Sequence, residues 1–282
     1  MYKRWFSRQP LGAFWAVSIF ALLLYSFIYI VYPFSQPVDD LVLNVVYLAC
    51  VLSPAWIASA VLKSYDPNDA PIRIWKYFSI GFWAWAAAEF VWVGYNLILG
   101  EVPHVNLSDP LYLAGYILMT FAIAGQYRLA RYQSEVSERF IVFAIWISIL
   151  LLSTFLFFIT SMVPPAFLSF AEYVGAFLNI VNGVGDLTLA IAGLIMISLF
   201  RGGALGRPWW GFIILAVADV FYGWLAQAGA YDYQTISGDL LRLASDLIYM
   251  LAYLVISHSF LRQLILLRFG PSETSPTIPR RK

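Results

Sequence analysis

The sequence predicts an all-α, polytopic membrane protein with eight transmembrane helices, and three observations support this fold class. Of its 282 residues, 61% are hydrophobic and only 12% are charged, whereas a soluble domain carries roughly 25% charged residues. Eight apolar stretches follow one another, and each is long enough to cross about 30 Å of hydrocarbon as a helix. Sixteen of the seventeen Lys and Arg residues lie in every second gap between these stretches.

The same distribution predicts the orientation of the chain. Lys and Arg accumulate in cytoplasmic loops, and the gaps on the other side of the membrane hold only Arg242. We therefore expect both termini in the cytoplasm and a multi-pass location in a bacterial inner membrane.

The first half of the chain contains four predicted spans. The first follows a basic start, but its apolar run is too long for a signal peptide. The second contains the single cysteine, Cys50, which excludes an internal disulfide. The third carries Glu89 among many aromatic residues, and the fourth opens with Ser108, Asp109 and Pro110. The predicted spans are Leu11–Pro33, Val38–Leu62, Trp75–Gly100 and Leu111–Ala130.

The second half contains four more predicted spans, and the sixth segment is irregular. Pro164 and Pro165 break the chain before it. We therefore expect residues 167–179 to lie partly in the membrane interface and the spanning helix to begin at Ile180. The predicted spans are Phe140–Met162, Ile180–Phe200, Trp209–Gly229 and Leu240–Leu267.

The two halves are similar in sequence. Residues 108–116, Ser-Asp-Pro-Leu-Tyr-Leu-Ala-Gly-Tyr, match residues 245–253, Ser-Asp-Leu-Ile-Tyr-Met-Leu-Ala-Tyr, and Glu89 corresponds to Asp219. We expect two four-helix repeats, residues 1–133 and 134–270, in parallel orientation because each has an even number of spans. The polar residues 271–282 are predicted to form a disordered cytoplasmic tail.

Five acids are predicted to converge in one outward-facing cavity between the repeats: Glu89, Asp109, Asp186, Asp219 and Asp246. An ionised side chain at membrane depth is costly and normally faces a bundle interior or a wet cavity. Arg242 stands one helical turn before Asp246 on the same face. Local ion pairs and hydrogen bonds between helices are the alternative explanation for each acid taken singly.

Aromatic side chains accompany the acids. In each repeat the Asp is followed by Tyr at positions i+3 and i+7, which share its helix face. Aromatic rings beside carboxylates suit a cationic or flat amphipathic ligand, although helix packing also uses such rings. The candidate ligand-binding residues are Glu89, Trp92, Asp109, Tyr112, Tyr116, Asp186, Asp219, Tyr222, Arg242, Asp246, Tyr249 and Tyr253.

Several other functions lack the residues they require. No Lys lies deep in a span to hold retinal, and neither a His-Glu-x-x-His metal motif nor a glycine-rich phosphate loop occurs. The net charge of +1 comes without a basic stripe for nucleic acid. No feature favours an enzyme, and neither catalytic residues nor a particular cofactor are predicted.

The pattern Ala-x-Ala-Glu-x-x-Trp followed by Ser-Asp-Pro-Leu-Tyr-Leu-Ala-Gly-Tyr resembles a known group of membrane modules. These are the multispanning N-terminal sensory regions of bacterial diguanylate cyclases and sensor histidine kinases. Gly-Asp-Leu at 185–187 and Ala-Asp-x-x-Tyr at 218–222 are also similar. The resemblance covers about residues 38–267 and implies an integral-membrane sensing role. It departs from the group after Leu267, where no cyclase or kinase sequence follows.

The expected function is therefore a ligand-binding sensory module in the lipid bilayer, without an output domain of its own, that signals through a cytoplasmic partner. One alternative is a small proton-coupled transporter, because transporters use repeats and acids near the membrane midplane. A third possibility is a structural subunit of a membrane complex, in which the acids only join helices.

Overall fold

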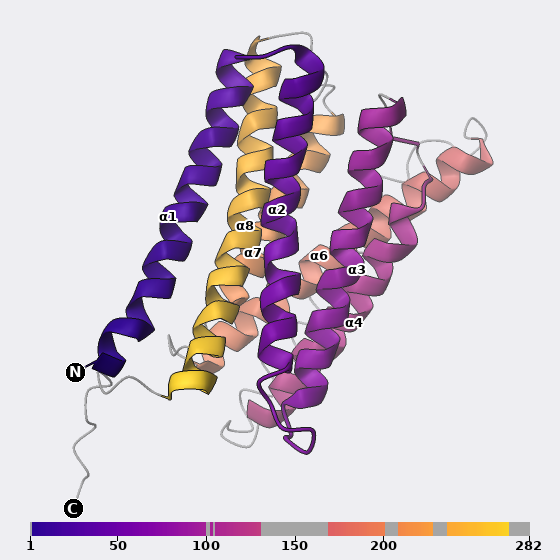
Figure 1. The fold of residues 1–282 in the computed structure, drawn as a ribbon. Coiled ribbons are helices and arrows are strands. Elements are labelled where there is room, and N and C mark those ends of the chain that lie inside the picture. The colour runs from indigo at the N-terminus through magenta and orange to yellow at the C-terminus, as the bar shows by residue number, and fades with distance from the viewer. Residues whose placement is uncertain are drawn as a thin grey trace, which may run out of the picture.

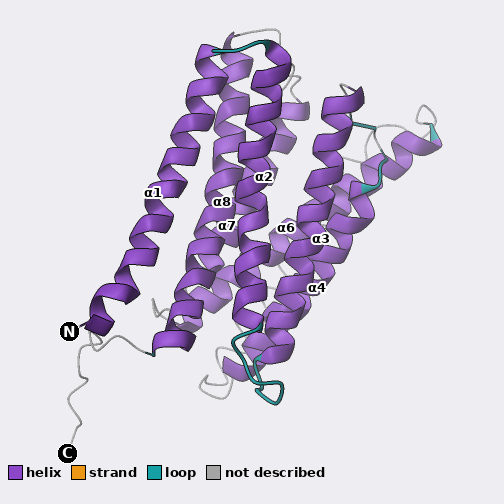
Figure 2. Ribbon diagram, viewed as in Figure 1, coloured by secondary structure: helices purple, strands orange, loops and turns teal. Residues whose placement is uncertain are grey.

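The computed structural model describes residues 2–99, 102–103, 105–130, 169–200, 208–227 and 236–270. These residues form helices and short connections without a strand (Figure 2). The predicted fifth span, Phe140–Met162, and the predicted tail lie outside the described residues. The described helices are α1 (Tyr2–Val31), α2 (Gln36–Leu62), α3 (Ile72–Leu99), α4 (Ser108–Ala130), α6 (Phe170–Phe200), α7 (Pro208–Gln227) and α8 (Ile236–Phe269).

Four of the described helices are long and apolar enough to cross a membrane, which confirms the membrane class. These segments are Pro10–Val31, Gln36–Leu62, Ile72–Leu99 and Leu240–Phe269. Helices α6 and α7 contain shorter apolar segments, Val181–Ile197 and Trp209–Tyr222. The predicted fourth span corresponds to helix α4, which is not among these four segments. Its polar residues Asp109, Gln126 and Arg128 lower its mean hydropathy.

Large apolar side chains cover the outside of the bundle. Phe20, Trp56 and Phe90 are each about two thirds exposed, at 65%, 66% and 64%. A soluble monomer rarely exposes apolar surface on this scale, whereas lipid tails are a suitable solvent for it. The exposed side chains therefore agree with helices that contact lipid.

Six helices close into a ring. Helix α2 packs on α3, α3 on α4, α4 on α6, α6 on α7, α7 on α8, and α8 on α2. Helix α1 lies outside the ring against α2 and α8 (Figure 1). The start of α1 and the end of α8 lie at the same end of the bundle, beside the α2–α3 connection (Figure 1). We call this the basic end, because it carries Lys63, Arg73, Lys76 and Arg268.

The connections at the two ends follow local sequence signals. Helix α1 stops at Tyr32, which adopts φ 49° immediately before Pro33, and proline cannot continue a helix. Helix α2 begins after Ser35, with proline in its first turn, the position where proline is tolerated. Helix α8 ends at Phe269, and the following Gly270 has a φ of 76°, which suits a glycine that terminates a helix.

Helix α6 is longer than the predicted sixth span, Ile180–Phe200, but its apolar segment, Val181–Ile197, lies within that span. Helix α6 is continuous from Phe170 to Phe200 and passes through Ile180 without interruption. Pro164 and Pro165 lie outside the described residues, and no proline occurs within α6. Packing against α4 and α7 on both sides supports the helix through Gly183 and Gly185, although glycine alone is a weak helix former.

Two glycines in corresponding positions allow close helix packing. A Cβ added at Gly81 of α3 would lie 3.1 Å from Met119 Cγ and 3.4 Å from the Gly115 carbonyl oxygen, both in α4. A Cβ added at Gly211 of α7 would lie 2.2 Å from Ile256 Cγ1 and 3.0 Å from the Ala252 carbonyl oxygen, both in α8. Because Gly81 and Gly211 each lie eight residues before the matched acids Glu89 and Asp219, the two helix pairs use the same contact.

Candidate functional site

Glu89 of α3 lies inside the ring and is surrounded by tyrosine hydroxyls. Its side chain is buried, and Tyr253 of α8 donates a hydrogen bond to Glu89 Oε1 at 3.1 Å. The hydroxyls of Tyr112 in α4 and Tyr47 in α2 lie near the same carboxyl. Tyr253 therefore satisfies a group that would be costly to bury alone, and two further helices place hydroxyls close to it.

Asp186 of α6 and Asp219 of α7 form the second part of the site. Tyr116 of α4 donates a hydrogen bond to Asp186 Oδ1, and Tyr249 of α8 donates one to Asp219 Oδ1. The Asp186 and Asp219 side chains lie close enough to interact electrostatically. Two buried carboxyl groups side by side repel each other when both are ionised, so each depends on its tyrosine donor.

These residues form a group of neighbouring carboxyls and tyrosines, held by three tyrosine–carboxyl hydrogen bonds, which we call the carboxyl–tyrosine network. Each of the six ring helices contributes at least one side chain to it, and the electrostatic interaction between Glu89 and Asp219 joins its two parts. The bonds Tyr116–Asp186 and Tyr253–Glu89 connect the N-terminal half of the chain to the C-terminal half. Its members are Tyr47, Glu89, Tyr112, Tyr116, Asp186, Asp219, Tyr249 and Tyr253.

A separate group surrounds Asp246, nearer the end opposite the basic end. Tyr25 of α1 donates a hydrogen bond to Asp246 Oδ2 at 2.8 Å, and Arg242 Nε lies 3.9 Å from the same oxygen. Tyr222 of α7 interacts electrostatically with Arg242 and Asp246. Arg242 and Asp246 therefore lie on the same helix face, as predicted, and form the local ion pair that is the alternative to a shared cavity. We call Tyr25, Tyr222, Arg242 and Asp246 the outer cluster.

Asp109 and Trp92 lie apart from the bonds of the network. The Asp109 carboxylate accepts the backbone N–H of Asn106 at 2.8 Å, so it organises the connection before α4. Trp92 is half-buried on α3. The matched acids Asp109 and Asp246 thus differ in environment, because Asp246 is buried under α1.

Three residues near these sites were missed by the sequence analysis. Tyr47 and Tyr25 each lie within a long apolar helix. Nothing in the local sequence distinguishes them from tyrosines that only pack against neighbouring helices. Asp39 is only 1% exposed, and neither of its carboxyl oxygens accepts a hydrogen bond from the described part of the chain. Its position in the first turn of α2 resembles an ordinary helix start, where acids are favoured.

An aromatic layer separates the network from the basic end. Phe78 and Phe82 of α3 pack against Phe212 of α7 and Phe260 of α8, with ring centroids 5.5–6.4 Å apart. Phe82 and Phe78 follow Glu89 toward the basic end of α3, and Phe260 follows Tyr253 in the same direction on α8. The layer therefore lies between the carboxyl groups and the basic end.

No family model, curated protein or solved structure matches this chain. Within the described residues, no group of His, Cys, Asp and Glu side chains has the arrangement of a metal site. Cys50 is buried. The chemistry available at the site is therefore that of carboxyl and phenol groups, which exchange protons, accept and donate hydrogen bonds and attract cations.

Proposed function

We propose that this protein is an integral-membrane sensory module that binds a small cationic or flat amphipathic ligand through the carboxyl–tyrosine network and signals through a cytoplasmic partner. The single observation that carries the proposal is that every helix of the ring contributes to one polar network. A ligand that changes the bonds of this network changes the packing of all six helices. Such a change shifts an equilibrium only if the ligand prefers one arrangement.

The proposed repeats support a mechanism in which two units move against each other. The contact at Gly81 between α3 and α4 corresponds to the contact at Gly211 between α7 and α8. The packing of α2 on α8 likewise corresponds to that of α6 on α4. The two bonds Tyr116–Asp186 and Tyr253–Glu89 would then cross between units, where a ligand would have the largest effect on their relative position.

The resemblance to the sensory regions of diguanylate cyclases and histidine kinases supports the same proposal. Of the five acids that it implicates, Glu89, Asp186 and Asp219 are members of the network, whereas Asp109 and Asp246 lie apart from it. We propose a bacterial inner-membrane location with the basic end in the cytoplasm, where Lys and Arg favour it. A cytoplasmic signalling partner would then contact this end, and the ligand would enter from the opposite side.

Proton-coupled transport is a second candidate, favoured by the closeness of the buried Asp186 and Asp219 side chains. Transporters place protonatable groups and substrates between repeats near the membrane midplane. In this scheme the aspartate pair would exchange its proton during each cycle, and the aromatic layer would act as the barrier toward the basic end.

Tryptamine, an aromatic ring that carries an ammonium group, is a suitable first probe of ligand binding. We expect it to raise the unfolding temperature of the purified protein in proportion to its occupancy of the site. The substitution Asp219→Asn should remove most of this increase, because it removes a negative charge and keeps the acceptor for Tyr249. Asp40→Asn, at an exposed acid near the start of α2, is the matched control and should respond like the wild type.

The same probe in lipid vesicles separates the two candidate functions. Binding without accumulation under a pH gradient supports sensing, whereas gradient-driven uptake that Asp219→Asn abolishes supports transport. Choline, a cation without a ring, serves as a second probe. If neither compound stabilises the protein or is taken up by the vesicles, both proposed functions of the network are contradicted.

A further inference from the structure

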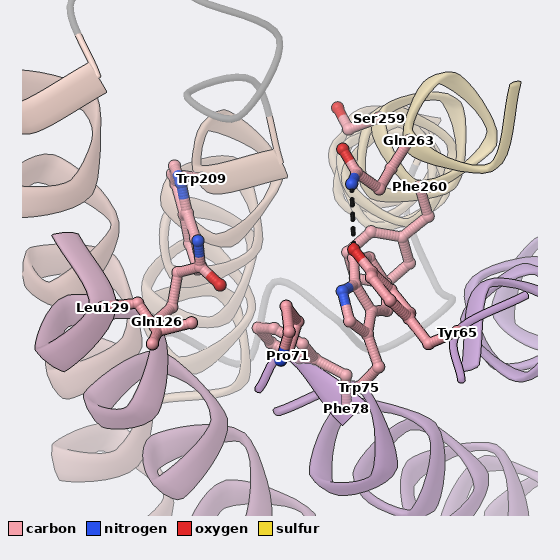
Figure 3. A pocket seen from close by; sticks show the side chains of 10 residues that line it. All are labelled: Tyr65, Pro71, Trp75, Phe78, Gln126, Leu129, Trp209, Ser259, Phe260 and Gln263. Carbon is pink, nitrogen blue, oxygen red and sulfur yellow. Dashed lines mark hydrogen bonds between the residues drawn. The ribbon is translucent and has the colours of Figure 1, made fainter. Parts of the chain in front are cut away.

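A cavity of about 260 Å³ lies at the basic end of the bundle, beyond the aromatic layer (Figure 3). Helices α3, α4, α7 and α8 and the connection between α2 and α3 surround it. It is smaller than most drug-sized ligand sites, which have volumes of about 300–1,000 Å³. We call it the basic-end pocket; its size suits a molecule built on a single ring.

The walls of the basic-end pocket are mainly aromatic. Trp75 and Phe78 of α3, Trp209 of α7 and Phe260 of α8 line it, and all four are buried. Trp75 and Phe260 meet edge to face with centroids 5.0 Å apart, which fixes the position of both rings. Flat aromatic faces favour a planar guest, which gains both apolar burial and stacking.

Polar groups occupy two sides of the same pocket. Gln263 Nε2 donates a hydrogen bond to the Tyr65 hydroxyl at 3.1 Å, which leaves the Gln263 amide oxygen and the Tyr65 proton available. Ser259 donates to the Val255 carbonyl oxygen, so its own oxygen retains acceptor capacity. Gln126 lies on the other side of the pocket (Figure 3), and its amide has no hydrogen-bond partner within the described residues.

None of the ten described residues that line the pocket carries a charge. A charged guest would lose its hydration there without gaining an opposite charge, which is costly. An uncharged guest with oxygen atoms would receive hydrogen bonds from the amide and hydroxyl groups. The described lining therefore favours an uncharged guest over cations and organic anions.

We propose that the basic-end pocket binds an uncharged, single-ring molecule with carbonyl or hydroxyl oxygens on the ring, the chemistry of a quinone head group. The ring stacks among Trp75, Trp209 and Phe260, while Gln126 and Gln263 hydrogen-bond to oxygens on opposite edges. The aromatic layer separates this site from the network, so the inference goes beyond the proposed function and does not rest on it.

Equilibrium dialysis of the purified protein with the ubiquinone head group, lacking its isoprenoid chain, tests this inference. We expect saturable binding to the wild type. Gln126→Leu and Gln263→Leu should each weaken binding about three- to tenfold, the effect of losing one hydrogen bond. Asn44→Leu removes an amide that contacts the Asp40 carbonyl oxygen on α2, away from the pocket, and should bind like the wild type.

A variant that fills the pocket provides a second measurement. Leu129 lines the pocket and is 43% exposed, so Leu129→Trp adds volume at the rim without replacing a core residue. We expect it to abolish binding and to leave the unfolding curve unchanged. Tighter binding of a decyl-chain quinone than of the bare head group would identify a membrane lipid as the source. Equal binding of the two would identify a water-soluble aromatic compound instead.

Three results would overturn the proposal. The first is a lack of saturable binding of the head group to the wild type. The second is equal binding by the wild type and by Gln263→Leu and Leu129→Trp. The third is stronger binding of gentisate, a ring carboxylate, than of the neutral hydroquinone. None of these results bears on tryptamine binding at the carboxyl–tyrosine network, so the two proposals are tested independently.

Discussion

Replacement of Gly211 by alanine is expected to lower the free energy of unfolding by about 3 kcal/mol, near the upper range for overpacking of a tight interface. The new Cβ would lie 2.2 Å from Ile256 Cγ1 and 3.0 Å from both the Ala252 carbonyl oxygen and the Ile256 nitrogen. Two of these three atoms belong to the backbone of α8, so a side-chain rotation cannot relieve the contact. Helix α8 must move away from α7, which disturbs the bonds of Tyr249 and Tyr253.

Unfolding in mixed detergent micelles measures this effect. Gly183→Ala in α6 is the matched control, because no atom lies within 4 Å of the added Cβ. This change should leave stability equal or raise it by up to about 1 kcal/mol, since alanine favours a helix over glycine. Equal stability of the two variants would show that α7 and α8 do not approach each other as described.

Replacement of Glu89 by leucine is expected to lower the free energy of unfolding by about 1–3 kcal/mol, the cost of a buried polar group without a partner in soluble proteins. The Tyr253 hydroxyl would lose its acceptor. Interhelical hydrogen bonds in membranes average about 0.6 kcal/mol, so we expect a loss toward the lower end of this range.

Glu89→Gln is the matched control for this substitution. The amide keeps a carbonyl oxygen that accepts a hydrogen bond from Tyr253, so we expect less than half the loss of stability seen with leucine. The same micelle unfolding assay compares the two variants. The interpretation fails if leucine is as stable as the wild type, or if glutamine is as destabilising as leucine.

The membrane class could be predicted because hydropathy and the distribution of Lys and Arg are read directly from the sequence and do not depend on tertiary contacts. Seven members of the network could be predicted for a related reason. A carboxyl group within an apolar helix is costly, which makes Glu89, Asp186 and Asp219 conspicuous, and the spacing of Tyr249 and Tyr253 follows helix geometry.

The partners of these residues could not be predicted from local patterns. Nothing adjacent to Tyr47 indicates that it reaches Glu89, and nothing adjacent to Tyr25 indicates Asp246, because both contacts depend on how the helices close into a ring. The match between Asp109 and Asp246 was likewise insufficient to predict their different environments. Asp246 is buried under α1, whereas Asp109 lies in the first turn of α4 and bonds to the connection before it. The outward opening of the predicted cavity remains a prediction.

A double-mutant cycle on Glu89 and Tyr253 tests most directly the claim that one polar network joins the two halves of the chain. The cycle compares Glu89→Leu, Tyr253→Phe and the double variant by their free energies of unfolding. A pair of Asp109→Asn with Tyr253→Phe is the control, because Asp109 bonds within its own connection. We predict that the first pair is non-additive by more than about 0.5 kcal/mol, the range of directly interacting residues. Additive effects within about 0.3 kcal/mol would contradict the account.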